Sequence, residues 1–218
     1  MKKEFLLFII CVSLFTSLHA QRFKAGALAG IVTSQVDGDT YAGYNKAGML
    51  VGGFVASKFS DVSKWSVSFE ITYIQKGSRK TPHPDKGDFA DYKLKLNYVE
   101  VPLLVKYDVG RVIDTSGLRG MHFTFIGGVA IGTLIYSAEW DAFGPLSGGT
   151  PFQKKDVPVI LGLNYSFSKH IGFDVRTEYS LFPVRKGGTS SYYQNWTSNF
   201  FKPGYYNNLI IFLFRYRI

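Results

Sequence analysis

The stretch that decides the fold is "LIIFLFRYRI", residues 209–218, with which the printed sequence ends. Its even-numbered positions, from Ile210 to Ile218, are all apolar or aromatic, whereas its odd-numbered positions run from Leu209 to Arg215 and Arg217. Successive side chains of a β-strand point to opposite faces. The stretch therefore predicts a strand with one wholly apolar face and a second face that carries two cations.

The same alternation recurs along the chain. It is clearest in "WSVSFEITYIQKG" (65–77) and "HIGFDVRTEYSL" (170–181), and weaker versions cover 22–34, 46–57, 92–107, 120–134 and 157–168. With a terminal strand from about Tyr205, these segments predict eight strands. Connectors are long after the first, third, fifth and seventh segments, short after the second and sixth, and intermediate after the fourth.

Beyond the N-terminus, no apolar run approaches the roughly 18 residues that a membrane helix needs. The chain is nevertheless rich in aromatic residues, with 14 Tyr and 19 Phe. A membrane protein without membrane helices has to be a closed β-barrel. We predict an all-β, eight-stranded, antiparallel up-and-down transmembrane β-barrel with long loops at one rim and short turns at the other.

The N-terminus is typical of a cleaved secretory signal. Met1-Lys2-Lys3 is basic, Phe5–Phe15 is apolar, and "SLHA" ends in a small residue before Gln21. We predict a signal peptide at 1–20 and an outer-membrane β-barrel domain at 21–218. The only cysteine, Cys11, lies in the signal, which excludes a disulfide scaffold. The net charge of +9 suits anionic lipid or acidic glycan better than nucleic acid in this compartment.

Alternation alone also fits a soluble, lipocalin-like barrel. Strand length, mixed charges on the polar faces and aromatic residues near strand ends favour the membrane barrel. The aromatic residues are Tyr44, Trp65, Tyr73, Tyr92, Tyr107, Tyr136, Trp140, Tyr165, Tyr179, Tyr205 and Tyr216. Because an eight-stranded barrel is narrow and filled by side chains, the charged residues of the polar faces are predicted to pair inside the lumen. They are Glu70, Glu100, Lys106, Asp174, Arg176, Glu178, Arg215 and Arg217.

In the segment 92–107 the apolar positions change phase, from even numbers up to Tyr98 to odd numbers from Val99. An extra residue swaps the two faces of a strand, so we predict a bulge near Tyr98–Pro102. The last strand is predicted to close the barrel against the first, with both termini in the periplasm.

Several stretches resemble the PorT-like family of outer-membrane barrels from Bacteroidota. They are "AGALAG", "YNKAGMLVGGFV", "SFEITYIQKGS" and, most specifically, "LNYVEVPLLVKY", with weaker likeness in "GLNYSF" and "RYRI". The resemblance implies an eight-stranded barrel. One founding member of that family is an accessory of the type IX secretion system, so the resemblance also raises an accessory role in secretion.

Candidate chemistry is sparse. His83 with Asp85, Asp88 and Asp91 has the residue types of a metal or acid–base cluster, but "PHPDKGDFAD" reads more simply as a solvated loop. His122 has no partner at recognisable spacing for nucleophilic catalysis. Glu70, Arg176, Glu178 and Arg215 suit a proton relay, although a space-filling ion-pair network is the simpler interpretation. We predict no catalytic residue, metal or cofactor.

The stretch "RKGGTSSYYQNWTSNFFKPGYY" (185–206) combines cations with aromatics and is the strongest candidate for surface binding. Its candidate residues are Arg185, Lys186, Tyr192, Tyr193, Trp196 and Lys202. Such a loop suits stacking on sugars, contact with lipid A phosphates or binding of a partner protein. The alternative is a loop that folds over the barrel mouth and buries its own aromatics.

These observations predict a non-enzymatic integral outer-membrane protein whose long extracellular loops serve structural, accessory or partner-binding roles. Its expected partners are outer-membrane lipid including lipopolysaccharide, the barrel assembly machinery and an envelope or secretion protein, and not nucleic acid. Two alternatives stay open: an outer-membrane barrel enzyme acting on lipid A or peptides, and a soluble periplasmic barrel that binds a ligand in its lumen.

Overall fold

The computed structural model describes residues 23–39, 41, 43–60, 62–112, 121–146, 149–187 and 204–218. Neighbouring long strands of the sheet are antiparallel and follow one another in chain order. The prediction of eight strands is confirmed, and the predicted signal at 1–20 lies outside the described residues. The long strands are β1 (Lys24–Asp37), β2 (Lys46–Lys58), β3 (Trp65–Lys80), β4 (Tyr92–Val112), β5 (Met121–Asp141), β8 (Pro158–Ser166), β9 (Ile171–Ser180) and β11 (Gly204–Arg217).

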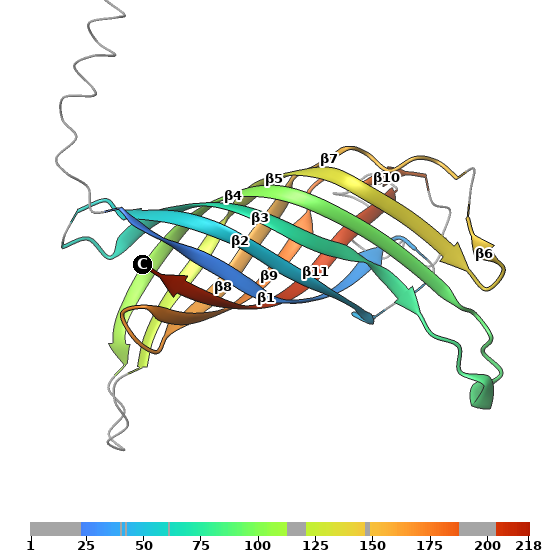
Figure 1. Cartoon of the computed structure of the whole chain (residues 1–218), viewed down its shortest axis with the longest axis horizontal. Coiled ribbons are helices and arrows are strands. Elements are labelled where there is room, and N and C mark those ends of the chain that lie inside the picture. The colour runs from blue at the N-terminus through green and yellow to red at the C-terminus, as the bar shows by residue number, and fades with distance from the viewer. Residues whose placement is uncertain are drawn as a thin grey trace, which may run out of the picture.

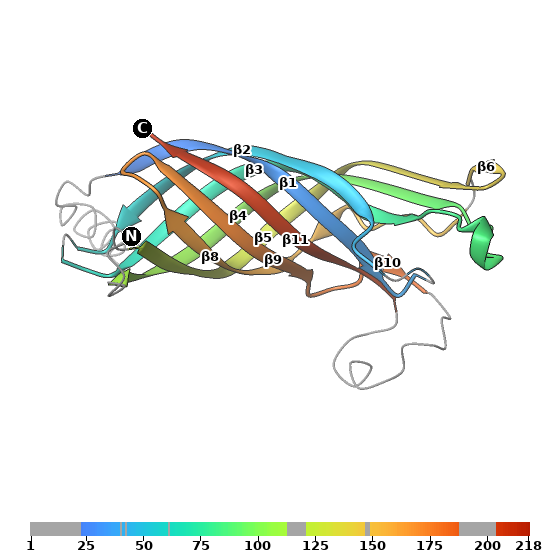
Figure 2. The same ribbon diagram turned by 90° about the horizontal axis from the view of Figure 1, so that it is seen from below.

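The sheet closes into a barrel because β11 pairs with β1. Their register runs from Gly26 opposite Arg217 to Asp37 opposite Tyr206. The amide of Ile218 adds a hydrogen bond to the carbonyl of Ala25, at 2.9 Å. Figure 2 shows β11 lying between β1 and β9 along the barrel wall. Closure satisfies the backbone groups that an open edge would leave bare in hydrocarbon, and the predicted pairing of the last strand with the first is confirmed.

The two ends of the barrel differ. Figure 1 places the C-terminal end of β11 at one end and the short elements η1 (Pro84–Lys86) and β6 (Gly144–Pro145) at the other. The second end, which we call the long-loop rim, also receives β7 (Lys155–Asp156) and β10 (Arg185–Lys186). In the described part of the chain, no helix is long and apolar enough to cross a membrane.

Three strands continue past their neighbours at the long-loop rim. β3 residues 76–80 pair with β4 residues 92–96, and β4 residues 92–97 pair with β5 residues 136–141. We call these segments the three-strand extension. Its neighbour β2 pairs with β3 only as far as Leu50 opposite Ile74, so the extension projects beyond the rest of the barrel.

The apolar faces of the strands point outward. Phe69 is 48% exposed while Glu70 next to it is 0% exposed, and Phe214 at 59% lies next to the fully buried Leu213. In a soluble protein charged residues are usually exposed and phenylalanines usually buried. Here the arrangement is the reverse. The predicted orientation, with apolar side chains outside and charged side chains in the lumen, is therefore confirmed.

A bulge lies beside Tyr98, as predicted, but its extra residue is not in β4 and it does not swap the faces of β4. β4 and β3 keep one continuous register, and the extra residue lies in β5, between Leu134 opposite Tyr98 and Tyr136 opposite Asn97. Alternation in β4 persists, so that Leu94, Leu96 and Tyr98 face inward throughout. The apolar phase changes because this part of the lumen is itself apolar.

Apolar side chains fill much of the lumen, from Leu28 and Phe54 to Tyr92 at the long-loop rim. The main hydrophobic cluster contains Leu28, Val32, Val36, Leu50, Phe54, Ile74, Tyr92, Leu94, Leu96, Tyr98, Leu209, Ile211 and Leu213. A smaller cluster joins Leu104, Ile126, Ala130 and Ile160. Tyr92 was grouped with the interfacial aromatics, but it faces the lumen and donates a hydrogen bond to Glu139 at 2.6 Å. Trp65, Tyr136 and Tyr216 are about half exposed near strand ends, where an aromatic girdle is expected.

Candidate functional site

Five inward-facing residues from four strands form the first ion-pair cluster: Glu70, Lys106, Asp174, Arg176 and Arg215. The guanidinium of Arg176 binds both carboxylate oxygens of Glu70, at 2.8 and 3.1 Å, and reaches Asp174 at 2.7 Å. Arg215 bridges the same two carboxylates at 2.8 and 2.9 Å. All of these side chains are nearly or fully buried, and together they span the barrel from β3 to β9 and β11.

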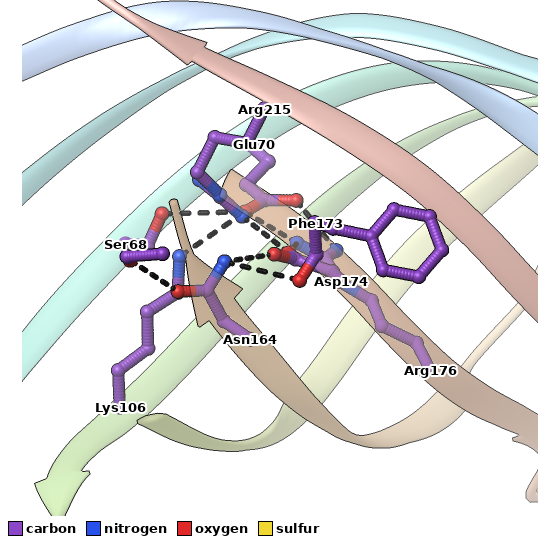
Figure 3. A network of polar contacts seen from close by, with 9 residues as sticks. Ser68, Glu70, Lys106, Asn164, Phe173, Asp174, Arg176 and Arg215 are labelled. Carbon is purple, nitrogen blue, oxygen red and sulfur yellow. Dashed lines mark hydrogen bonds and ion pairs between the residues drawn. The ribbon is translucent and has the colours of Figure 1, made fainter. Parts of the chain in front are cut away.

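Neutral groups complete the first cluster. Ser68 donates to Glu70 at 3.3 Å, and the Asn164 amide donates to Asp174. Lys106 approaches Glu70 to 3.7 Å. Figure 3 shows these side chains converging inside the barrel, while the ring of Phe173 points away from them. When ionised, the cluster holds three cations and two carboxylates.

A second ion-pair cluster lies nearer the long-loop rim and centres on Lys76. Its ammonium contacts Glu100 at 2.5 Å, Asp156 at 3.3 Å and Glu178. It also lies 5.0 Å from the ring centre of Tyr98. The short strand β7 supplies Asp156 by pairing Asp156 with Gly132 of β5.

Four charged groups of this second cluster are almost unexposed, yet one cation faces three carboxylates. Ser180 and Asn207 donate to Asp156 at 3.0 and 2.9 Å, which satisfies one of its oxygens. Because the Lys76 ammonium occupies the centre of the carboxylates, the arrangement ties four strands together: β3, β4, β7 and β9. Within the described residues, no group of His, Cys, Asp and Glu is arranged to hold a metal ion.

Glycines leave room for the buried charges. A Cβ atom built on Gly162 would lie 2.9 Å from Cγ of Arg176 and 2.6 Å from the Val175 carbonyl oxygen. On Gly132 it would lie 3.0 Å from Oε1 of Glu100. The inward glycines of β5 and β8 thus make space for the long charged side chains of the facing strands.

A third polar group lines the long-loop rim. Arg185 pairs with Glu139 at 2.7 Å, and its guanidinium lies 3.8 Å from the ring centre of Phe152 and 5.5 Å from that of Tyr205. Next to β1, Asp39 is buried and accepts a hydrogen bond from the amide of Tyr41 at 3.0 Å. Burial raises the pKa of Asp39 to about 6.

The structure brings seven of the eight predicted lumen residues into the two clusters. Arg217 is the exception, since it donates to the carbonyl of Lys169 at 3.3 Å near the opposite rim. Of the loop candidates, Arg185 faces Glu139 and Lys186 is exposed. The candidates Tyr192, Tyr193, Trp196 and Lys202 lie outside the described residues.

Two central residues, Lys76 and Asp156, are absent from the predicted set. Both are at even-numbered positions, which face inward in these two segments. Lys76 continues the inward series of Glu70 and Thr72, and Asp156 comes two residues before the inward Pro158. Extending the alternation beyond the apolar core of each segment would have placed both in the lumen.

The histidines lie apart from the clusters. His83 pairs with Asp88 through the backbone beside η1, and Asp88 binds Lys80 at 2.5 Å. His122 contacts Asp108 at 3.1 Å, with both side chains partly exposed. Among the hydrogen bonds of the described residues, neither imidazole is paired with a serine hydroxyl.

A closed eight-stranded barrel with an apolar exterior and a charged, filled interior defines the class of transmembrane β-barrels. The family model "Outer membrane protein beta-barrel domain" matches residues 12–185, and the chain belongs to this family. The protein is thus an outer-membrane β-barrel protein. A search of curated proteins found no match.

Solved structures with a similar fold include three bacterial surface proteins, each 13% identical to this chain. The match with Ail, the attachment invasion locus protein of Yersinia pestis, covers 89% of this chain and 98% of the Ail chain, with a TM-score of 0.49. The match with Neisserial surface protein A covers 90% of this chain and 97% of that protein's chain, with a TM-score of 0.43. OprG from Pseudomonas aeruginosa covers 90% and 94%, with a TM-score of 0.39. At this identity the likeness concerns the fold alone.

Proposed function

We propose that the protein is a non-enzymatic, non-conducting outer-membrane barrel that acts through its long-loop rim as a structural or accessory component, with its termini in the periplasm. The observation that carries the proposal is the filled lumen. Two ion-pair clusters cross it, and two hydrophobic clusters pack beside them and fill the remaining space. Eight strands enclose little more than the volume of such side chains.

The absence of a conduit is tested by conductance. The purified full-length protein is reconstituted in planar phospholipid bilayers and compared with a reconstituted porin. We expect no steady single-channel current from this protein. Reproducible ohmic channels, at a protein density at which the porin conducts, would refute the plugged lumen.

The non-enzymatic assignment draws on the positions of the candidate groups. His83 lies in an exposed loop, and His122 is near the rim opposite the long loops, where its ion-pair partner is Asp108. We expect the lipid A mass profile and periplasmic peptides of a deletion strain to match those of the parent. A product that is lost on deletion and also lost in the His122→Ala strain would favour the barrel enzyme instead.

An accessory role in type IX secretion rests on the family resemblance of "LNYVEVPLLVKY" and its companions alone. It is tested by comparing the secreted proteins of parent and deletion strains, with complementation by the full-length chain. Retention of several secreted proteins in the periplasm supports the role. Unchanged secretion removes it and leaves a structural barrel.

A further inference from the structure

The three-strand extension carries cations on its outward face. Register places Arg79 of β3 directly opposite Lys93 of β4, and Lys93 opposite Trp140 of β5. Lys95 lies two residues along, opposite Gly77 and Ala138. The ammonium groups of Lys93 and Lys95 lie 6.0 and 5.4 Å from the ring centre of Trp140. We call Arg79, Lys93, Lys95 and Trp140 the outward basic patch.

Among the described residues, this patch has no partner of opposite charge. Lys80, next in the chain to Arg79, pairs with Asp88 at 2.5 Å. For Arg79, Lys93 and Lys95, in contrast, no ion pair is formed with any carboxylate of the described residues. Like charges directly opposite in a β-sheet destabilise it, so the Arg79–Lys93 pair is a cost in the isolated protein.

A fourth cation adds to the positive field. Lys46, at the rim end of β2, is almost unexposed on the inward face, where its ammonium donates a hydrogen bond to the carbonyl of Ala47 at 2.9 Å. Arg79, Lys93 and Lys95 therefore form the outward group of cations, and Lys46 lies on the inward side of the same rim. An external anion bound to Arg79, Lys93 and Lys95 would relieve the repulsion among them.

The position of the patch along the barrel axis indicates which anion it can reach. On β4 the outward positions run from Leu103 and Val99, which are 50% and 39% exposed, through Asn97 to Lys95 and Lys93. Lys95 and Lys93 lie two and four residues above Asn97, or about 7 and 13 Å along a tilted strand at roughly 3.3 Å per residue. Tyr136 lies opposite Asn97 and marks the interface between chain region and headgroups. The cations thus lie at the level of headgroups, on the face that is turned to lipid.

We infer that the outward basic patch binds the phosphate groups of the glycolipid in the outer leaflet, with Arg79 and the two lysines as ligands and Trp140 as the surface that positions the lysine stems. Arg presents two donors to a phosphate and Lys a point charge. An aromatic ring at headgroup level suits the sugar to which these phosphates are attached. This site is separate from the plugged lumen, so the failure of either proposal leaves the other standing.

Binding is tested with the full-length protein folded in zwitterionic detergent micelles. The probes are bisphosphorylated lipid A and the same lipid A with both phosphates removed, and binding is followed by native mass spectrometry. The patch variant combines Arg79→Gln, Lys93→Gln and Lys95→Gln. The matched control combines Lys58→Gln, Lys64→Gln and Lys169→Gln, which remove three exposed cations at the opposite rim.

We expect the wild-type protein to bind the bisphosphorylated lipid at least about tenfold more tightly than the dephosphorylated one, since basic residues near an anionic surface act together. The patch variant loses this preference and the control variant keeps it. A patch variant that retains the preference, or a control that loses it equally, overturns the proposal.

A further arm separates lipid from soluble anions. Inorganic phosphate and a sulfated polysaccharide are added to micelles without lipid A. If either binds the wild-type protein as tightly as bisphosphorylated lipid A, and the patch variant loses that binding, the patch recognises a soluble anion and the assignment to lipid is overturned. Weak binding of both supports a lipid site.

Discussion

Glu70→Gln tests the first ion-pair cluster most sharply, because Glu70 is the acceptor on which its cations converge. The carboxylate takes three hydrogen bonds from Arg176 and Arg215, and it is 0% exposed. The amide keeps the shape of the side chain but removes the charge. The change therefore leaves three buried cations around Asp174 alone.

The expected loss of stability follows from the buried cations that remain without a partner. Removing one partner of a buried ion pair costs about 3–5 kcal/mol, because the remaining charge has no compensation. We expect Glu70→Gln to lower the free energy of unfolding by about this amount. Adding Arg215→Met removes one surplus cation, so we expect the double variant to be more stable than the sum of the single effects by at least about 1 kcal/mol.

The assay is reversible denaturant unfolding in phospholipid bilayers, followed by tryptophan fluorescence. Arg217→Met is the control, since Arg217 also lies in β11 but outside the clusters; its expected effect is below about 0.5 kcal/mol. A Glu70→Gln protein within about 0.5 kcal/mol of the wild type, or additive single effects, would refute the reasoning.

Three further predictions concern the second cluster, the inward glycines and the rim. Lys76→Met leaves three buried carboxylates without a cation, so it should lower the free energy of unfolding in denaturant titrations by about 3–5 kcal/mol; a loss below about 1 kcal/mol contradicts this. Gly162→Ala should destabilise by about 1–3 kcal/mol in the same titration, whereas Gly53→Ala, whose added Cβ meets only an oxygen at 3.5 Å, should not. Asp39 has a pKa raised by burial to about 6, so its ionisation costs stability as the pH rises from about 4 through 6. Asp39→Asn should therefore match the wild type in melting temperature at pH 4 and exceed it at pH 7.5. Asp88→Asn should melt below the wild type at pH 7.5 and approach it only below about pH 4, because a hydrogen bond from Lys80 lowers the pKa of Asp88 from 3.8 and the stabilising effect is lost as the pH falls through that range; a deficit that disappears as the pH rises instead would be evidence against this assignment.

The alternation of apolar and polar residues was sufficient to find the eight strands, because successive residues of a barrel strand face lipid and lumen in turn. It failed at the three-strand extension. β5 was predicted at 120–134 but continues to Asp141 in the extension. β4, predicted at 92–107, was missed at the other rim, where it continues to Val112. In the extension β5 carries Ser137 and Glu139 on the inward face, after the extra residue has shifted its alternation, and pairing with β4 maintains the strand.

The candidate site was predictable in part. Parity places Glu70, Arg176 and Arg215 in the lumen, but which charges meet depends on the stagger of strands around the barrel, which is a property of the closed sheet. Lys76 was missed because it lies beyond the apolar core of its segment. The outward basic patch could not be predicted from the sequence, because Arg79 and the two lysines become neighbours only through the register of β3 and β4.

The most direct measurement of the central claim is photolabelling of the wild-type protein in bilayers with a lipid-soluble diazirine, followed by mass spectrometry at residue resolution. The barrel described here predicts labels on Phe69, Ile71 and Phe173, which face the acyl chains, and none on Glu70 or Asp174. Labels on Glu70 and Asp174, with Phe69 and Phe173 spared, would show that charged side chains face the lipid and would contradict the account.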